Sequence, residues 1–236
     1  MIEIIPTNTC PPDFTELTAR SKFFSEFATC IQLDAADGVF VPATSWPYFA
    51  GQSAELDALI QAGKGFPYSD ILTYEVHIMA QTPQETGEKF ARAGIQRVIG
   101  HVEAFAGAEE VRDALAAWKK AAAREVGLAV LLDTPVAAFE PFLPLCDVVQ
   151  LMSIAKLGYQ GAAFEPGIYE RIKEVRALHP HLVIEIDGGV SASNIAELAA
   201  AGASRFGVGS AITKAEHPKA AYENLKSLAE RAQKVG

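Results

Sequence analysis

Short apolar segments alternate with longer amphipathic stretches along all 236 residues, and this alternation constrains the fold more than any other feature. The strand candidates are residues 2–5, 29–34, 72–78, 97–101, 127–132, 147–152, 182–187 and 204–208. Each is four to seven residues long and rich in β-branched side chains, which is typical of strands buried on both faces of a parallel sheet. Between them, apolar residues at three- and four-residue spacing predict helices over 13–27, 53–62, 82–93, 107–123, 135–143, 165–178, 191–201 and 217–234.

Two of these helices carry local start signals. Thr82 precedes Pro83, and proline is favoured at the first helical position because its missing N–H is not needed there. Ser191 is a candidate N-cap for the helix over 191–201.

Eight strand–helix pairs in 236 residues give about 30 residues per pair, close to the ~250 residues of a (β/α)8 barrel. A doubly wound open sheet alternates in the same way, but no glycine-rich dinucleotide fingerprint follows the first strand candidate. No linker or low-complexity tract divides the chain. The sequence therefore predicts an α/β fold, a (β/α)8 TIM barrel formed by one domain over residues 1–236.

Charge and composition exclude several classes of function. With 20 basic and 29 acidic residues the formal charge is −9, and no basic run offers a face for nucleic acid or for an anionic membrane. The apolar runs are too short to span a bilayer. The N-terminus has no secretory pattern, and Cys10, Cys30 and Cys146 match no metal spacing, so we expect a cytoplasmic protein with reduced thiols.

Polar residues gather where the predicted strands end, which is where (β/α)8 barrels carry their chemistry. The second strand ends in Gln32 and Asp34, and the third in Glu75 and His77; residues two apart share a face. Further candidates follow on three other strands: His101 and Glu103, Glu185 and Asp187, and the run from Gly207 to Ser210. Each of these residues also has a structural reading, as a cap, a packed histidine or an ion-pair partner. Their joint occurrence on one rim of the predicted barrel favours a functional role over a structural one.

Glycine-rich segments follow the seventh and eighth strands. Gly188, Gly189, Gly209 and Ser210 lie there, where barrels commonly bind phosphate through exposed backbone N–H groups. A phosphorylated small molecule is the ligand that this pattern predicts.

Several strings taken together resemble the ribulose-phosphate 3-epimerase family. They are IQLDAADGVFVP (31–42), YEVHIM (74–79), IGHVEA (99–104), VVQLMSI (148–154), IEIDGGVSASNI (184–195) and GVGSAI (207–212). The D-x-x-D-G-x-F-V-P and D-G-G-V parts are the specific ones, and the matches run in order across nearly the whole chain. The resemblance implies a (β/α)8 barrel that inverts carbon 3 of a ketopentose 5-phosphate and assembles as a homo-oligomer.

The resemblance also implies roles for individual residues. Asp34 and Asp187 match the paired acid and base, and His77 matches a metal ligand and substrate contact. The phosphate loops match at Gly158, Gly161, Gly188, Gly189, Gly209 and Ser210. Removing the proton beside a ketone leaves a planar enediolate, so inversion needs one carboxylic group on each face. The implied cofactor is a divalent cation (Zn, Mn, Fe or Co) held by Asp34, His77 and Asp187.

The chain departs from the family's pattern at four positions. The family's strand-two metal histidine is Gln32, a poorer ligand for zinc, so this site holds a metal weakly, holds a different one or holds none. Ala36 stands where a methionine would border the reacting carbons, and the family's serine near the first strand is Thr7 or Asn8. After the sixth strand Lys156 adds a cation, which either approaches the substrate or faces solvent.

Three functions follow from these observations. The first is a ketose-phosphate 3-epimerase of altered specificity. The second is a non-catalytic phosphosugar-binding paralogue that kept the phosphate loops. The third is a related barrel lyase or decarboxylase, but its D-x-K-x-x-D pattern on strand three is absent from Tyr74-Glu75-Val76-His77.

Overall fold

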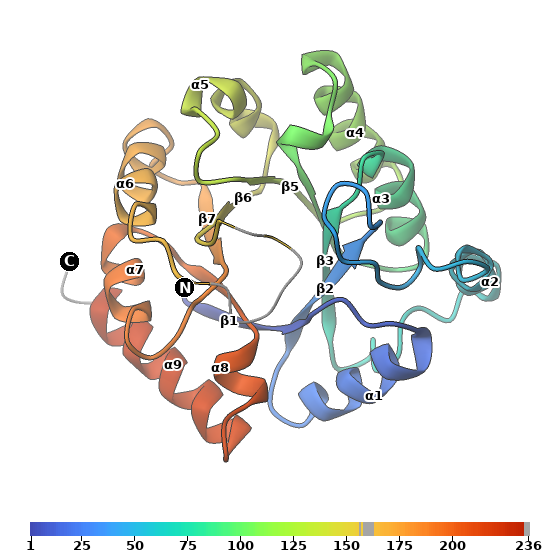
Figure 1. The fold of residues 1–236 in the computed structure, drawn as a ribbon, viewed down its shortest axis with the longest axis horizontal. Helices are drawn as coiled ribbons and strands as arrows, with labels where there is room; N and C mark the ends of the chain where they lie inside the picture. Colours follow the sequence, from blue (N-terminus) through green and yellow to red (C-terminus); the bar gives the residue numbers. More distant parts are fainter. Residues whose placement is uncertain (156, 158–162, 234–236) are drawn as a thin grey trace.

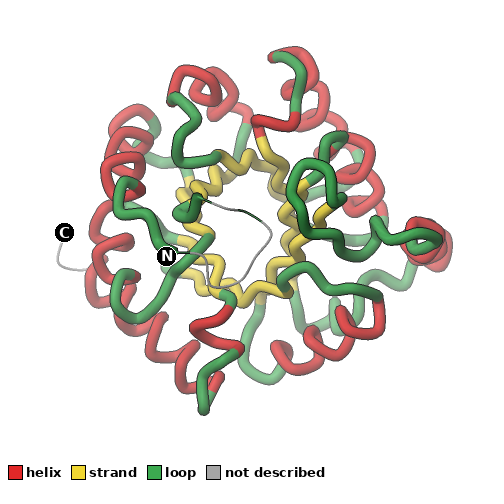
Figure 2. The backbone as a smooth tube through the Cα atoms, in the orientation of Figure 1, coloured by secondary structure: helices red, strands yellow, loops and turns green. Residues whose placement is uncertain are grey.

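Eight parallel strands close into a barrel in the order β1-β2-β3-β4-β5-β6-β7-β8, as the alternation predicted. The strands are β1 (Glu3–Asn8), β2 (Cys30–Ala36), β3 (Thr73–Met79), β4 (Arg97–His101), β5 (Glu125–Val130), β6 (Val148–Met152), β7 (Val183–Asp187) and β8 (Arg205–Val208). The computed structural model describes residues 1–155, 157 and 163–233. The helices form an outer ring around the strands (Figures 1 and 2).

The longer helices lie close to their predicted positions. They are α1 (Phe14–Ser25), α2 (Ser53–Ala62), α3 (Pro83–Arg92), α4 (Ala108–Lys120), α6 (Ile168–Leu178), α7 (Ile195–Ala201) and α9 (Pro218–Gln233). Their apolar faces and the outward faces of the strands form one continuous core, in which Trp46, Trp118, Phe90 and Phe206 are fully buried. No helix among the described residues is long and apolar enough to cross a membrane.

The structure corrects three predicted helices and adds one. The helix expected from residue 165 begins at Ile168, and the one expected from Ser191 begins at Ile195 with Asn194 as its N-cap. The helix expected over 135–143 is a short α5 (Val136–Phe139) followed by the 3₁₀ segment η2 (Glu140–Leu145). The additional helix is α8 (Ser210–Thr213), which is too short to show a periodic pattern. A single 3₁₀ turn, η1 (Val102–Ala104), follows β4.

The two ends of the barrel differ in chemistry. At the N-terminal end of the strands, Arg97 pairs with Glu3 at 2.9 Å and Arg205 pairs with Glu125 at 2.5 Å. Two longer pairs, Arg205 to Glu3 at 3.1 Å and Arg97 to Glu125 at 3.6 Å, complete a ring of alternating charge. This ring closes the barrel at the end opposite the loops that carry barrel active sites, so we assign it to stability.

Candidate active site

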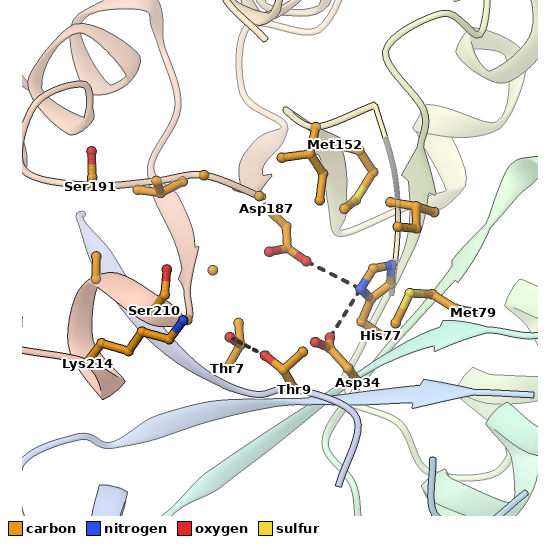
Figure 3. A pocket seen from close by; sticks show the side chains of 18 residues that line it. Thr7, Thr9, Asp34, His77, Met79, Met152, Asp187, Ser191, Ser210 and Lys214 are labelled. Carbon is orange, nitrogen blue, oxygen red and sulfur yellow. Dashed lines mark hydrogen bonds and ion pairs between the residues drawn. The ribbon is translucent and has the colours of Figure 1, made fainter. Parts of the chain in front are cut away.

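A cavity of about 430 Å³ lies over the C-terminal end of the barrel (Figure 3). Its walls come from the ends of β1, β2, β3, β6, β7 and β8 and from the loops that follow them. Its lining includes Asp34, His77 and Asp187 together with Gly188, Gly189, Gly209 and Ser210. The structure therefore brings together the acidic residues and the glycine loops that the sequence placed on one rim.

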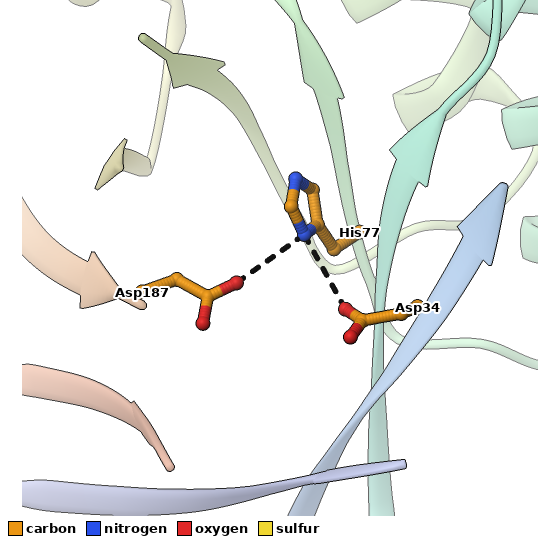
Figure 4. A group of neighbouring side chains, drawn as sticks. All are labelled: Asp34, His77 and Asp187. Atoms are coloured by element: carbon orange, nitrogen blue, oxygen red, sulfur yellow. Dashed lines mark ion pairs between the residues drawn. The ribbon is translucent and has the colours of Figure 1, made fainter. Parts of the chain in front are cut away.

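Asp34 and Asp187 approach the same imidazole nitrogen (Figure 4). His77 Nδ1 lies 3.4 Å from Asp34 Oδ1 and 3.4 Å from Asp187 Oδ2. The strand register explains half of this contact, because Asp34 on β2 is the partner of His77 on β3. Asp187 ends β7 on the far side of the barrel, so only closure of the sheet brings it to the other two.

The Gln32 amide lies beneath the two carboxylates. Its Nε2 donates to Asp34 Oδ1 at 2.9 Å and to Asp187 Oδ2 at 3.0 Å, the same two oxygens that face His77. Gln32 is completely buried. The sequence resemblance put this residue at a metal-ligand position, whereas in this structure it contributes N–H donors to the carboxylates.

The environment moves the two carboxylic groups in opposite directions. Burial raises the pKa of Asp34, and the nearby charge of Asp187 adds to this. Burial also opposes ionisation of Asp187, but the hydrogen bond and charge of His77 outweigh it and hold the pKa of Asp187 below its ordinary value. Asp34 therefore keeps its proton to a higher pH than Asp187 does.

His77 is the cation of the group. Burial alone would lower its pKa, but the hydrogen bonds and charges of Asp187 and Asp34 raise the pKa of His77 to about 9. The other ring nitrogen, Nε2, lies 2.9 Å from Nε2 of His101. Burial and the charge of His77 lower the pKa of His101 to about 4, although its contact with Glu103 opposes this. A neutral His101 therefore accepts, at its Nε2, a hydrogen bond from the Nε2–H group of His77.

A second carboxylate orients His101 from behind. His101 Nδ1 lies 3.0 Å from Glu103 Oε2, and Glu103 Oε1 accepts from the backbone N–H of Leu131 at 2.8 Å and from Thr134. Phe40 packs over the His101 ring at 5.0 Å between centroids. These contacts fix the tautomer and tilt of His101, and through it the orientation of His77.

Three of these residues could hold a divalent cation. One ligand atom each from Asp34, His77 and Asp187 lies within 4.8 Å of the others, and His77 Nδ1 is a buried nitrogen with no hydrogen bond of ordinary length. Two carboxylate oxygens and an imidazole nitrogen suit a first-row transition metal. The adjacent Gln32 nitrogen does not, because it carries hydrogens instead of a lone pair.

The glycine loops permit a close approach of backbone to ligand. Gly188 and Gly189 have φ of 107° and 65°, a region that favours glycine. A Cβ on Gly188 would lie 2.7 Å from Ile154 Cγ1, so no larger residue fits there. Lys156, Gly158 and Gly161, which the resemblance also assigned to substrate binding, lie outside the described residues.

Sequence reasoning missed Lys214, which lines the cavity beside Ser210 (Figure 3). The spacing held a signal, because residues four apart in a helical turn share a face. Of the two replacements for the family's serine, Thr7 lines the cavity, whereas Asn8 Nδ2 donates away from it to the Leu17 carbonyl at 3.3 Å.

An apolar wall completes the cavity. Ala36 packs in one cluster with Met79, Met152, Ile154 and Leu157, and all but Ala36 line the cavity. Side chains from β3 and β6 and from the loop after β6 thus form the apolar wall of the cavity.

Fold and cavity together define a (β/α)8-barrel protein with two carboxyl groups and an imidazole clustered at the C-terminal end of the barrel and glycine loops beside them. Residues 9–213 match the model of the Ribulose-phosphate 3 epimerase family, and the chain belongs to that family. The Chlamydia pneumoniae protein named ribulose-phosphate 3-epimerase is 34% identical over 185 residues, covering 75% of this chain and 73% of that one. The protein of the same name from Mycobacterium leprae (strain TN) is 30% identical over 221 residues, covering 92% and 91%.

Solved structures support the fold at much lower identity. The 3-keto-L-gulonate-6-phosphate decarboxylase from Vibrio cholerae O1 biovar El Tor has a TM-score of 0.70 at 12% identity, covering 98% of this chain and 99% of that one. The 3-hexulose-6-phosphate synthase from Salmonella typhimurium has a TM-score of 0.66 at 14% identity, covering 98% and 100%. These similarities concern the barrel alone.

Proposed function

We propose that this chain is a ketose-phosphate 3-epimerase, an isomerase that inverts carbon 3 of a ketopentose 5-phosphate through an enediolate. One observation carries the proposal: two carboxylic groups with pKa values moved in opposite directions flank one imidazole in a cavity that glycine loops also line. Family membership, and the names of its relatives, support the same reaction.

Asp34 and Asp187 are the acid/base pair in this proposal. Ionised Asp187 takes the proton from carbon 3, and the electron pair of that C–H bond moves into the enediolate. Protonated Asp34 then delivers its proton to the opposite face of the same carbon, which inverts the centre. In the reverse direction the two residues exchange roles, so each must reach both protonation states.

The oxygens of Asp34 and Asp187 that do not contact Gln32 and His77 are the ones that transfer protons. Within the described part of the chain, Asp34 Oδ2 and Asp187 Oδ1 accept no side-chain hydrogen bond, while Oδ1 and Oδ2 respectively are held from below. One oxygen of each carboxylic group therefore fixes its position and the other is free to react.

The phosphate end of the substrate binds to the glycine loops. Backbone N–H groups of Gly188, Gly189 and Gly209 and the hydroxyl of Ser210 are suitable donors to a phosphate dianion, and Lys214 adds a positive charge beside them. We also propose Lys156, Gly158 and Gly161 as substrate contacts, on the strength of the family resemblance alone.

If a divalent cation (Zn, Mn, Fe or Co) binds at this site, Asp34, His77 and Asp187 are the residues that would hold it. When bound, such an ion supplies positive charge for the oxygens that become negative in the enediolate. The imidazolium of His77 already places one positive charge at this position.

The decisive experiment follows exchange of the carbon-3 proton in heavy water by NMR, with D-ribulose 5-phosphate first and then a panel of ketose phosphates. We expect exchange and epimer formation with at least one of them. Asp34→Asn and Asp187→Asn should each lower the rate by about 10²- to 10⁴-fold. Asp113→Asn, on the exposed face of α4, is the matched control and should leave it unchanged.

Two other outcomes would redirect the assignment. Saturable binding of a ketose phosphate without any exchange would identify the non-catalytic paralogue. Absence of both would refute the proposal. We further propose one barrel domain over residues 1–236, homo-oligomeric assembly and a cytoplasmic location; light scattering of the purified protein tests the assembly.

A further inference from the structure

The Gln32 amide bridges the two carboxylates of the possible cation site. Its Nε2 is within 3.0 Å of one oxygen from Asp34 and one from Asp187, and these are the oxygens closest to His77 Nδ1. An amide nitrogen with two hydrogens can donate to both at once. The Gln32 amide thus joins the acid/base pair as a cation would, without a metal.

A second buried amide fixes which way Gln32 faces. Gln150 Nε2 donates to Gln32 Oε1 at 2.7 Å and to Glu185 Oε1 at 2.8 Å. Gln32, Gln150 and Glu185 are completely buried. Because Glu185 draws the NH2 group of Gln150 toward itself, Gln150 presents hydrogens to Gln32, and the Gln32 oxygen must face it.

Turning the Gln32 amide over would break this arrangement. Its NH2 group would face the NH2 group of Gln150 across 2.7 Å, and its oxygen would face two carboxylate oxygens. Donor against donor and acceptor against acceptor are both unfavourable, and an unsatisfied buried polar group costs more than an exposed one. The Gln32 oxygen is therefore withheld from any cation at the site.

A cation bound by Asp34, His77 and Asp187 would meet this locked donor. It would compete with the Gln32 N–H groups for Asp34 Oδ1 and Asp187 Oδ2, and it would gain no fourth ligand from the barrel floor. The arrangement thus opposes metal binding through these two carboxylate oxygens.

We propose that Gln32, oriented by Gln150, makes the acid/base pair independent of a bound metal. Gln32 is a positioning residue: it holds one oxygen of each carboxylic group so that the other faces the substrate. This inference rests on the proposed epimerase function for its catalytic meaning, but its statement about metal is measurable without catalysis.

The test measures metal content and affinity first. Purified protein is passed over a chelating resin, bound metals are measured by mass spectrometry, and Zn²⁺ and Mn²⁺ are titrated by calorimetry. We expect the wild type to retain substoichiometric metal and to bind both ions weakly. Gln32→His replaces the locked donor by an imidazole ligand and should tighten binding by at least about 10- to 100-fold, the range by which supporting groups change metal affinity.

Gln150→Leu tests the lock without changing any atom at the site. Without Gln150 the Gln32 amide can turn and present its oxygen, so Zn²⁺ and Mn²⁺ should bind more tightly than to the wild type. Gln96→Leu is the matched control: Gln96 precedes β4 at the opposite end of the barrel, where its side chain accepts from the Tyr74 N–H at 2.8 Å. It should leave metal affinity unchanged. Circular dichroism verifies the fold of each variant.

Proton exchange with and without EDTA completes the experiment. We expect EDTA to leave the wild-type rate unchanged. Stoichiometric metal in the wild type together with loss of exchange in EDTA would overturn the proposal, and so would unchanged metal affinity in Gln150→Leu. If no ketose phosphate exchanges at all, the proposed function fails, while the metal titrations still decide this inference.

Discussion

Gly207→Ala should displace the carboxylate of Asp187, one of the two residues of the proposed acid/base pair, by a predictable distance. Gly207 lies on β8 directly across from Asp187, and a Cβ added to it would lie 3.0 Å from Oδ1 and 3.2 Å from Cγ of that residue. Ordinary contacts begin at 3.4 Å, so the carboxylate oxygen must retreat by roughly 0.4 Å. A misplacement of about 1 Å costs on the order of 100-fold in rate, so this shift should cost roughly sixfold.

The free energy of unfolding of Gly207→Ala should not fall with the exchange rate, and this difference separates a local effect on Asp187 from general destabilisation. Alanine is favoured over glycine inside a strand by about 0.5–1 kcal/mol, and Gly207 has no positive φ that requires glycine. We expect the rate of carbon-3 proton exchange to fall about sixfold. The free energy of unfolding in urea should stay constant or rise by up to about 1 kcal/mol.

Gly107→Ala is the control, because no heavy atom lies within 4 Å of the added Cβ and its backbone is extended. It should leave the exchange rate unchanged. An unchanged exchange rate in Gly207→Ala would refute the reasoning, since the position of Asp187 would then not limit the reaction. A loss of stability would show instead that β8 cannot take the methyl group.

Three further predictions test other parts of the structure. Gly87→Ala should gain about 1 kcal/mol of helix propensity in α3, but its Cβ would lie 2.2 Å from Nε1 of buried Trp118; overpacking by about 1–3 kcal/mol or more should leave a net loss in urea unfolding. Burial and the charge of a neighbouring carboxylate hold the pKa of Glu75 well above its usual range, so the folded state binds its proton more tightly than the unfolded chain does. The wild type should therefore lose stability relative to Glu75→Gln as pH rises above the ordinary glutamate pKa of about 4.3. Lys214→Met should raise KM for the phosphorylated substrate by about 10-fold with little change in melting temperature, because an exposed cation beside the glycine loops is lost.

The barrel was predictable because each buried strand appears in the sequence as a short run of apolar, β-branched residues. All eight strands lie where short β-branched runs predicted them, although β1 extends to Asn8 instead of ending at residue 5. Proline usually ends a predicted strand because it has no N–H to donate, so the prediction stopped before Pro6. In the structure β1 pairs with β8 through Glu3 to Pro6 and with β2 through Thr7 and Asn8. Pairing from two neighbours sustains the strand past the proline.

Helix starts were less predictable because side-chain caps compete locally. Ser191 lies before a run with helical spacing, but Asn194 Oδ1 accepts from the Ser191 N–H at 2.8 Å and closes a turn there. The helix α7 therefore begins only at Ile195. In the same way Pro166 and Gly167 form the turn that delays α6 to Ile168.

The sequence predicted which strand ends carry the site residues. It did not predict which of these side chains contact one another. Two-residue spacing puts Gln32 with Asp34, and closure of the barrel brings Asp187 to them. No local signal indicates that Gln150, 118 residues from Gln32, supplies the hydrogen bond that orients its amide. That contact depends on the stagger of β2 and β6 across the barrel, which a single sequence does not display.

Buried polar side chains connect the ring of ion pairs at the N-terminal end of the barrel to the carboxylates at its C-terminal end. Bulky branched side chains usually fill such barrels, but here amides and carboxyl groups do so from Asp34 down through Gln32 and Gln150 to Glu185. Below them, Glu75 lies 3.8 Å from the Arg97 guanidinium, which belongs to the ring of ion pairs at the N-terminal end. Each group in this column contacts the next, so Gln150 and Gln32 connect Glu185 to Asp34 and Asp187 without direct contact. A residue deep in the barrel can therefore be structural in its contacts and still determine what the rim can bind.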